Sequence, residues 1–144
     1  MHVGKFSRGL GLCNPIEYIP SMELPDEEYP MKMMTGRVLY HYNACAMTDK
    51  TEGLNEISGH SFIEINTEDA ERIGIKDGDR VKVSSRRGSI ETTANVSGKT
   101  NPGECWMPFH FLDGGANWLT SDALDSISST PEYKVCAVKI ENTK

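Results

Sequence analysis

The chain has 144 residues and a formal net charge of −6 at pH 7, which allows one hydrophobic core but not two complete domains. This acidic balance argues against general binding to nucleic acid or to an anionic membrane, because both need a basic face. No apolar run approaches the roughly 20 residues that cross a bilayer, and residues 1–15 lack a signal-peptide core, so we expect a cytoplasmic protein without membrane insertion.

Residues 1–30 are expected to form an extended, proline-rich arm or linker. They contain an acidic cluster and the prolines Pro15, Pro20, Pro25 and Pro30. Proline fixes φ and removes a backbone donor, so this segment should run along another surface rather than fold on its own. We therefore place the folded domain at residues 31–144.

Short β-strands are predicted after the arm. The stretch that begins at Met31 is apolar, and residues 61–66 also carry several apolar side chains. In residues 79–85 and 89–97 apolar and polar side chains alternate, which is typical of strands with one buried face. Residues 135–141 are apolar on both faces, as a central, covered strand would be.

One helix is predicted over residues 66–74. Asn66 or Thr67 is a suitable N-cap, acidic residues follow in the first turn, and Gly74 is a suitable stop. A second, single helical turn is expected to start at Thr120 or Ser121.

A hairpin is predicted at SSRRGS, residues 84–89, where Gly88 can adopt positive φ. Arg86 and Arg87 would then form a solvated tip or contact a partner domain. Many short strands, one small helix and frequent turns predict a mainly β protein with short helices, closed into a barrel.

The cysteines do not form a metal-binding pattern. Cys13, Cys45, Cys105 and Cys136 include no C-x-x-C pair, so no zinc or iron–sulfur site is predicted. Cys105 and Cys136 have apolar neighbours and should lie in the core. Cys45 has small and polar neighbours and is expected to be a loop thiol, open to solvent, that is neither a ligand nor a nucleophile.

The stretch TGRVLYHYNACAMT, residues 35–48, gathers an arginine, a histidine, two tyrosines, an amide and a thiol. This combination suits a polar, aromatic, phosphate-bearing ligand better than a packed core.

Four stretches occur in order: PDEEYP with TGRVLYHYNACAMT, then INTEDAERIGIKDGDRVKVSSRRG, GECWMPFHFLDGGANWLT and PEYKVCAVKIE. Together they closely resemble the C-terminal, molybdopterin-dinucleotide-binding domain of formate dehydrogenase catalytic subunits. The resemblance covers nearly the whole chain and implies a double-psi β-barrel. It also implies that the domain helps to bind a bis-molybdopterin guanine dinucleotide cofactor with molybdenum or tungsten, shared with other domains.

The resemblance implies that the first loop holds the pterin and the pyrophosphate. The candidates are Thr35, Gly36, Arg37, His41, Asn43, Met47 and Thr48. Arg37 can place a fork of two N–H groups on a phosphate or a pterin carbonyl, or it is a surface charge at a strand end. His41 is either a ligand contact and proton carrier or a core histidine with internal partners. The family more often has histidine, threonine, glycine and threonine where this chain has residues 43–46, NACA.

Two later segments supply the remaining candidates, which are Phe109, His110, Asn117, Tyr133 and Lys134. The Asn117 amide suits pterin and guanine, which both present alternating donors and acceptors. A lysine such as Lys134 can meet a phosphate as a point charge, or it is a solvated loop charge. Phe109, taken as strand-borne, is equally suited to packing in the core.

The resemblance also implies what this chain lacks. In the family, the metal ligand, the catalytic histidine and arginine and the iron–sulfur cluster lie in upstream domains, so we predict no catalytic residue and no metal ligand here. The expected partner is the remainder of the catalytic subunit, as part of the same chain or as a separate protein.

Three alternatives remain open from the sequence. The chain could be the small dinucleotide-binding subunit of an enzyme like formylmethanofuran dehydrogenase. It could be a non-enzymatic double-psi barrel that binds proteins. Because double-psi barrels include decarboxylases that cleave themselves at a Gly-Ser bond, Gly88-Ser89 also allows a pyruvoyl enzyme, although a hairpin turn explains this bond better.

Overall fold

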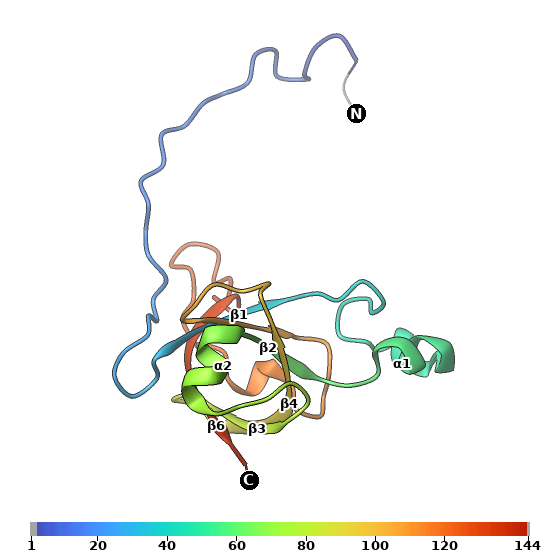
Figure 1. The fold of residues 1–144 in the computed structure, drawn as a ribbon. Coiled ribbons are helices and arrows are strands. Elements are labelled where there is room, and N and C mark those ends of the chain that lie inside the picture. The colour runs from blue at the N-terminus through green and yellow to red at the C-terminus, as the bar shows by residue number, and fades with distance from the viewer. Residues whose placement is uncertain (1–2, 144) are drawn as a thin grey trace.

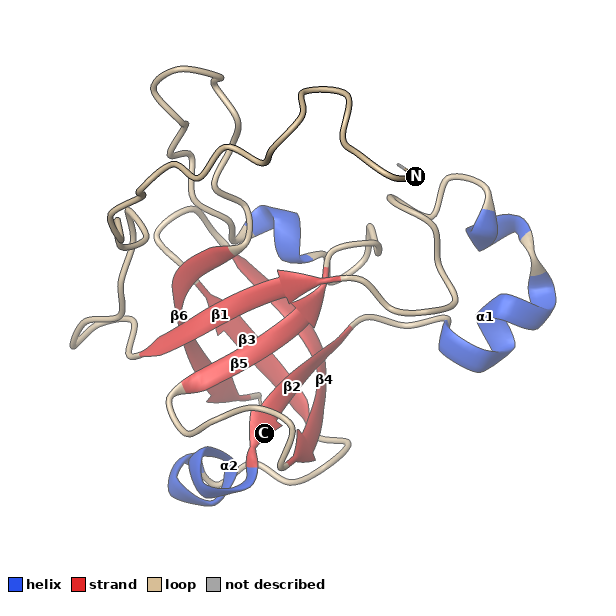
Figure 2. Cartoon of the chain, turned by 90° about the horizontal axis from the view of Figure 1, so that it is seen from above, coloured by secondary structure: helices blue, strands red, loops and turns tan. Residues whose placement is uncertain are grey.

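The computed structural model describes residues 3–143 and contains a six-stranded closed barrel. The strands are β1 (Met31–Gly36), β2 (Phe62–Asn66), β3 (Arg80–Ser84), β4 (Ser89–Ser97), β5 (Glu104–Pro108) and β6 (Val135–Asn142). Around the barrel they follow the order β1-β5-β2-β4-β3-β6 (Figures 1 and 2). β1 pairs in parallel with β5 and β2 with β4, whereas the other four pairs are antiparallel. Two interleaved parallel pairs make this a double-psi β-barrel, so the predicted fold is confirmed.

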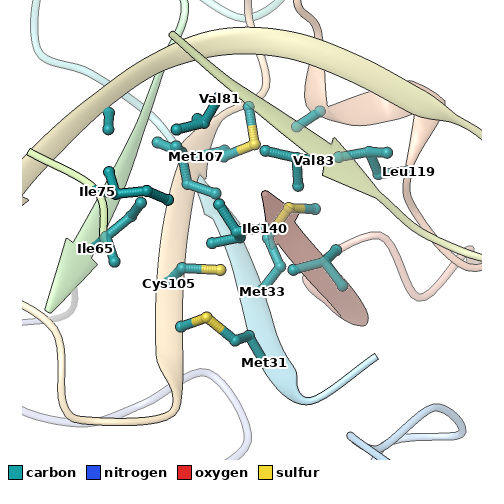
Figure 3. Close-up of a cluster of buried hydrophobic side chains, with 14 of the residues drawn as sticks. Met31, Met33, Ile65, Ile75, Val81, Val83, Cys105, Met107, Leu119 and Ile140 are labelled. Carbon is teal, nitrogen blue, oxygen red and sulfur yellow. The ribbon is translucent and has the colours of Figure 1, made fainter. Parts of the chain in front are cut away.

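The alternating pattern of the strands fills the barrel interior. Val81 and Val83 of β3 are fully buried, and the intervening Lys82 is exposed. Methionines of β1 and β5 meet these valines and the isoleucines of β2 and β6 in the centre (Figure 3). Burial of this apolar surface is the main favourable term in the stability of the barrel.

Cys105 and Cys136 lie in this core, as predicted. Burial raises the pKa of both thiols, that of Cys136 to about 11. Both therefore stay protonated and act as small apolar side chains.

The predicted helix is present as α2 (Thr67–Ile73). The Asn66 side chain accepts a hydrogen bond from the Glu68 N–H at 2.9 Å, so Asn66 is the N-cap. Gly74 ends the helix in the left-handed region, with φ of 71°.

The short helices elsewhere differ from the expectation. The turn expected at Thr120 or Ser121 is absent, and η2 (Ala116–Trp118) lies just before it. The reason is that the Thr120 hydroxyl donates to the Asn117 carbonyl and so closes η2 instead of starting a helix. Two helices were not predicted, η1 (Thr48–Lys50) and α1 (Glu52–Ser58). Neither helix has a buried residue, so the sequence shows no helical repeat of apolar side chains there.

The hairpin between β3 and β4 forms at the predicted place, and the Ser85 N–H donates to the Gly88 carbonyl at 2.8 Å. Gly88 does not adopt the positive φ that was expected. Arg86 and Arg87 are not a solvated tip, because both form ion pairs with Glu23.

The segment before β1 has two parts. Residues 3–20 contain no helix or strand and run away from the barrel (Figure 1), and Leu10, Ile16 and Tyr18 are almost fully exposed. Residues 22–29 return to the barrel surface through Glu23 and Asp26. Among residues 3–143, no helix has the length and apolar character that a bilayer crossing requires.

Candidate functional site

The strand directions gather three loops at one end of the barrel. β1 and β5 are parallel and end together, and β6 runs antiparallel to β1 and therefore starts at the same end. We call this end the rim and define it as residues 35–48, 109–119 and 132–134. α2 follows β2, which is antiparallel to β5, so this helix lies at the opposite end (Figure 2).

Two cations and two aromatic rings from separate loops meet on the rim. The Arg37 guanidinium carbon lies 5.8 Å from the centre of the Phe109 ring, and the Lys134 Nζ lies 5.3 Å from the same centre. Lys134 Nζ also lies 5.1 Å from the centre of the Tyr133 ring, which meets Phe109 edge to face at 6.3 Å. Contrary to the expectation, Phe109 follows β5 rather than lying within it.

Neither cation of this group has a counter-charge. Within residues 3–143, the ion pairs leave out both Arg37 and Lys134. In a chain of net charge −6, two cations beside aromatic faces make this part of the rim chemically suited to an anionic, flat ligand.

Thr35 and Gly36 fix this group to the barrel. The Thr35 hydroxyl donates to the Tyr133 carbonyl at 2.8 Å, and the Thr35 N–H donates to the Lys134 carbonyl at 3.0 Å. A Cβ on Gly36 would lie 2.5 Å from Nε1 of Trp106, so only glycine fits there. Both residues therefore act through the backbone geometry of the rim.

His110 joins the first two rim loops. It is 2% exposed, its Nε2 accepts a hydrogen bond from the Val38 N–H at 2.9 Å, and its Nδ1 donates to the Asn43 carbonyl. The Asn43 side chain is exposed, and its backbone adopts a φ of 48°. Both ring nitrogens are occupied, so His110 is a neutral structural link.

His41 has internal partners as well. Its Nε2 donates to the Ser58 carbonyl at 2.5 Å, and its Nδ1 lies 3.1 Å from the Thr48 hydroxyl. Thr48 also accepts a hydrogen bond from the Tyr42 N–H. His41 and Thr48 thus tie the first loop to the end of α1.

Met47 and Asn117 lie at the outside of the rim. Met47 is 76% exposed. Asn117 belongs to η2 and is exposed. Its backbone carbonyl accepts a hydrogen bond from the Thr120 hydroxyl. The structure thus places all twelve candidate residues on one end of the barrel. Arg37, Phe109, Tyr133 and Lys134 form one side-chain group, and the buried rings of His110 and His41 continue it inward, with 4.8 Å between the centres of Phe109 and His110 and 6.1 Å between those of His110 and His41.

Cys45 differs from the expectation of a solvent-exposed thiol. It is 6% exposed and has a φ of 60°. Burial raises the pKa of its thiol, and the nearby Asp49 charge raises it further. Cys45 is therefore a weakly reactive thiol.

A large cleft on one side of the rim, which shares residues 44–46 and 110–114 with it, was not predicted from the sequence. It has a volume of about 860 Å³ and is also lined by α1, the start of β2 and parts of β3 and β4. Among the candidate residues, only His110 lines it. Its carboxylates are Asp49, Glu56, Glu91 and Asp113, which face a single arginine, Arg80. The sequence signal was weak because the cleft depends on α1, which carries no buried residue.

The comparison with known families agrees with this architecture. The family model "Molydopterin dinucleotide binding domain" matches residues 31–137. The chain is 46% identical over 143 residues to the F420-dependent formate dehydrogenase 2 subunit alpha of Methanococcus maripaludis, and the match covers 98% of this chain and 21% of that protein. It is 45% identical over 143 residues to the F420-dependent formate dehydrogenase subunit alpha of Methanocaldococcus jannaschii, with the same coverage, 98% and 21%.

A solved structure has the same fold. Acetylene hydratase from Pelobacter acetylenicus superposes with a TM-score of 0.70 at 15% identity, over 79% of this chain and 18% of that one. The chain spans about a fifth of the length of the curated relatives it matches. The family model covers most of the barrel, and the alignments with the relatives extend over 98% of the chain. This chain therefore belongs to the molydopterin dinucleotide binding domain family.

Proposed function

We propose that this chain binds a bis-molybdopterin guanine dinucleotide cofactor through its rim, as the part of a formate dehydrogenase-like molybdenum or tungsten enzyme that holds the cofactor. The observation that supports this most is that two cations without an ion pair in residues 3–143, Arg37 and Lys134, lie 5.8 Å and 5.3 Å from the centre of the Phe109 ring. When bound, the cofactor supplies the redox chemistry of formate oxidation, and this chain supplies its position.

The residues of the rim fit such a cofactor. Arg37 can donate two parallel N–H groups to a pyrophosphate, and Lys134 can add a mobile point charge. The edges and faces of Phe109 and Tyr133 suit a flat heterocycle, which stacks on aromatic rings. Asn117, at the outer edge, offers an amide that matches the donor and acceptor pattern of a pterin or guanine.

The cleft beside the rim does not suit the phosphates. It contains four carboxylates and one arginine, and that arginine, Arg80, lies 3.7 Å from Glu91. Like charges would raise the energy of a bound pyrophosphate there. The proposal therefore places the phosphates on the Arg37 and Lys134 side of His110.

The histidines act as supports in this proposal. His110 and His41 use their ring nitrogens within the chain, so they hold the loop of residues 37–48 in the shape that faces the cofactor. Thr35 and Thr48 have the same role through their hydroxyl groups, Gly36 and Asn43 through their backbones, and Met47 adds exposed apolar surface.

The catalytic residues and the metal ligands belong, in this proposal, to the remainder of the catalytic subunit. Among residues 3–143, no group of three histidine, cysteine or carboxylate side chains could hold a metal ion. Residues 1–30 would be the segment that leads from the upstream domains into the barrel. The thiols, Cys13, Cys45, Cys105 and Cys136, are all free, which suits a reducing compartment and supports a cytoplasmic location.

The proposal is tested by calorimetric titration of the chain with GDP, which carries the guanine and pyrophosphate of the cofactor. We expect Arg37→Gln and Lys134→Gln each to weaken binding about fivefold, the loss of one exposed charge-assisted contact worth about 1 kcal/mol. The matched control is Lys139→Gln, because Lys139 lies on β6 and is already paired with Glu141 at 2.7 Å. Equal affinities for all four proteins would contradict a phosphate site on the rim.

A further inference from the structure

Glu23 is an almost buried carboxylate with three partners from distant parts of the chain. Its side chain is 11% exposed and forms ion pairs with both Arg86, at 3.1 Å, and Arg87. Its Oε1 also accepts a hydrogen bond from the Ala137 N–H at 2.9 Å. A carboxylate that is buried to this degree is held by its partners, because an unpaired charge there would be costly.

The partners of Glu23 belong to elements that shape the rim. Arg87 reaches past Glu23 and donates to the Leu119 carbonyl at 2.6 Å, directly after η2 and two residues after Asn117. Ala137 lies in β6, three residues after Lys134. One carboxylate thus links η2 and the start of β6 through the hairpin tip.

The neighbouring residue strengthens the same link. The Met22 N–H donates to Glu132 Oε2 at 3.0 Å, next to Tyr133. Arg86 is held in addition by Asp26 and by the Tyr29 ring, whose centre lies 4.8 Å from its guanidinium carbon. Residues 22–29 are therefore fastened to the barrel beside the rim.

We propose that Glu23 is a positioning residue that sets the placement of Asn117, Tyr133 and Lys134 by joining the segment before β1 to η2 and β6. Because this segment leads into the barrel, the same contacts make the rim respond to the position of the arm. The effect on the cofactor rests on the function proposed above, whereas the structural link does not.

The link is tested by amide hydrogen exchange on the full chain. Glu23→Gln keeps the size of the side chain but loses the two ion pairs, and Glu27→Gln is the matched control because Glu27 lies in the same turn and is exposed. We expect exchange to become about fivefold faster at Leu119 and Ala137, in line with the loss of a partly buried ion pair. The amide of Ile75, which closes α2 at the opposite end, should not change.

Several results would overturn the proposal. Exchange rates in Glu23→Gln that match those of Glu27→Gln would remove the link itself. Rates that rise equally at Ile75 would show a general loss of stability rather than local positioning. Arg87→Met is a second variant, since its side chain has no donor for Glu23 or for the Leu119 carbonyl. Unchanged exchange at Leu119 in this variant would contradict the proposal as well.

Binding of GDP separates this inference from the proposed function. If both hold, Glu23→Gln binds GDP about threefold more weakly than Glu27→Gln, because loosening a preformed site adds an ordering cost. If the unaltered chain binds no GDP, the proposed function fails, and the exchange rates alone decide whether Glu23 positions the rim. Equal GDP affinity in the two variants would refute the positioning role.

Discussion

Gly36 shows how strongly one residue shapes the rim. It ends β1 beside the Trp106 ring, and this ring in turn lies 5.8 Å from the Phe62 ring. The site of a Cβ on Gly36 is 2.5 Å from Trp106 Nε1, so any side chain would push the indole or bend β1. The requirement for glycine at this position is steric.

We expect Gly36→Ala to lower the free energy of unfolding by about 1–3 kcal/mol, the usual cost of overpacking. Urea unfolding measures this value. Gly98→Ala is the control, since a Cβ there meets nothing within 4 Å, and a loss of equal size in both variants would contradict the steric explanation.

His110 is the second residue with a large expected effect. We expect His110→Phe to fill the same space but leave the Val38 N–H and the Asn43 carbonyl without their partner, at a cost of about 1–3 kcal/mol. Hydrogen exchange at the Val38 amide should become faster than in the unaltered chain, whereas exchange in β3 should change less. His60→Phe, at an exposed position, should leave the free energy of unfolding and the exchange at Val38 unchanged. If exchange at Val38 stays slow in His110→Phe, the loop does not depend on the His110 link.

The β3–β4 hairpin and the segment of residues 22–29 form the most charged contact between elements. Burial raises the pKa of Glu23, but hydrogen bonds from Arg87 and Ala137 and the charges of Arg87 and Arg86 outweigh it, so the pKa lies below its ordinary value of 4.5. The carboxylate therefore stabilises the fold above that ordinary value, and this contribution is lost as the pH falls through the lowered pKa.

Because the pKa of Glu23 is lowered in the folded state, the contribution of the hairpin contact to stability should depend on pH. The chain should be more stable than its Glu23→Gln variant at about pH 6, and the difference should shrink at a pH well below 4.5, as the pH falls through the lowered pKa of Glu23. Urea unfolding at both pH values measures it. A difference that stays constant with pH would show that Glu23 acts through packing and not through its charge.

The elements differ in how far the sequence predicted them. β3, β4 and α2 were predicted correctly because alternation and the caps at Asn66 and Gly74 are local signals. α1 was missed because it is exposed all around, so no apolar period marks it. The role of Arg87 could not be read from the sequence either, since Glu23 lies 64 residues away and only the fold brings them together.

At the candidate site, the motifs named residues that the fold gathers at one end of the barrel, but they did not indicate the internal contacts of these residues. The motifs placed Arg37, Phe109 and Lys134 in loops that the fold brings together. The motifs could not show that the ring nitrogens of His110 and His41 form hydrogen bonds within the chain. Most of their partners are backbone groups, whose positions depend on the geometry of the loops. The acidic cleft has no motif at all, since its lining comes from five separate segments.

The whole molecule consists of a compact barrel and an arm that leaves it. Residues 11–20 are exposed throughout, whereas Glu23 is fastened to the barrel. The division between the two parts should therefore fall between residues 20 and 22.

Removal of residues 1–20 should leave the thermal midpoint within about 2 °C of the full chain, because few buried contacts are lost. Removal of residues 1–27 should lower it by about 3–6 °C, since the Glu23 contacts are lost as well and a change of about 1 kcal/mol has this effect in a domain of this size. Differential scanning calorimetry distinguishes the two. Equal midpoints for both truncated chains would contradict the division.

The central claim is that the Arg37 and Lys134 side of the rim, and not the acidic cleft or the α2 end, holds the dinucleotide cofactor. The most direct measurement is a titration of the isotope-labelled chain with molybdopterin guanine dinucleotide released from a holoenzyme, followed by amide chemical shifts. The account predicts shifts at residues 35–37, 109–110, 117 and 133–134 and none at α2. Shifts confined to α1 and the cleft carboxylates, or to α2, would contradict it.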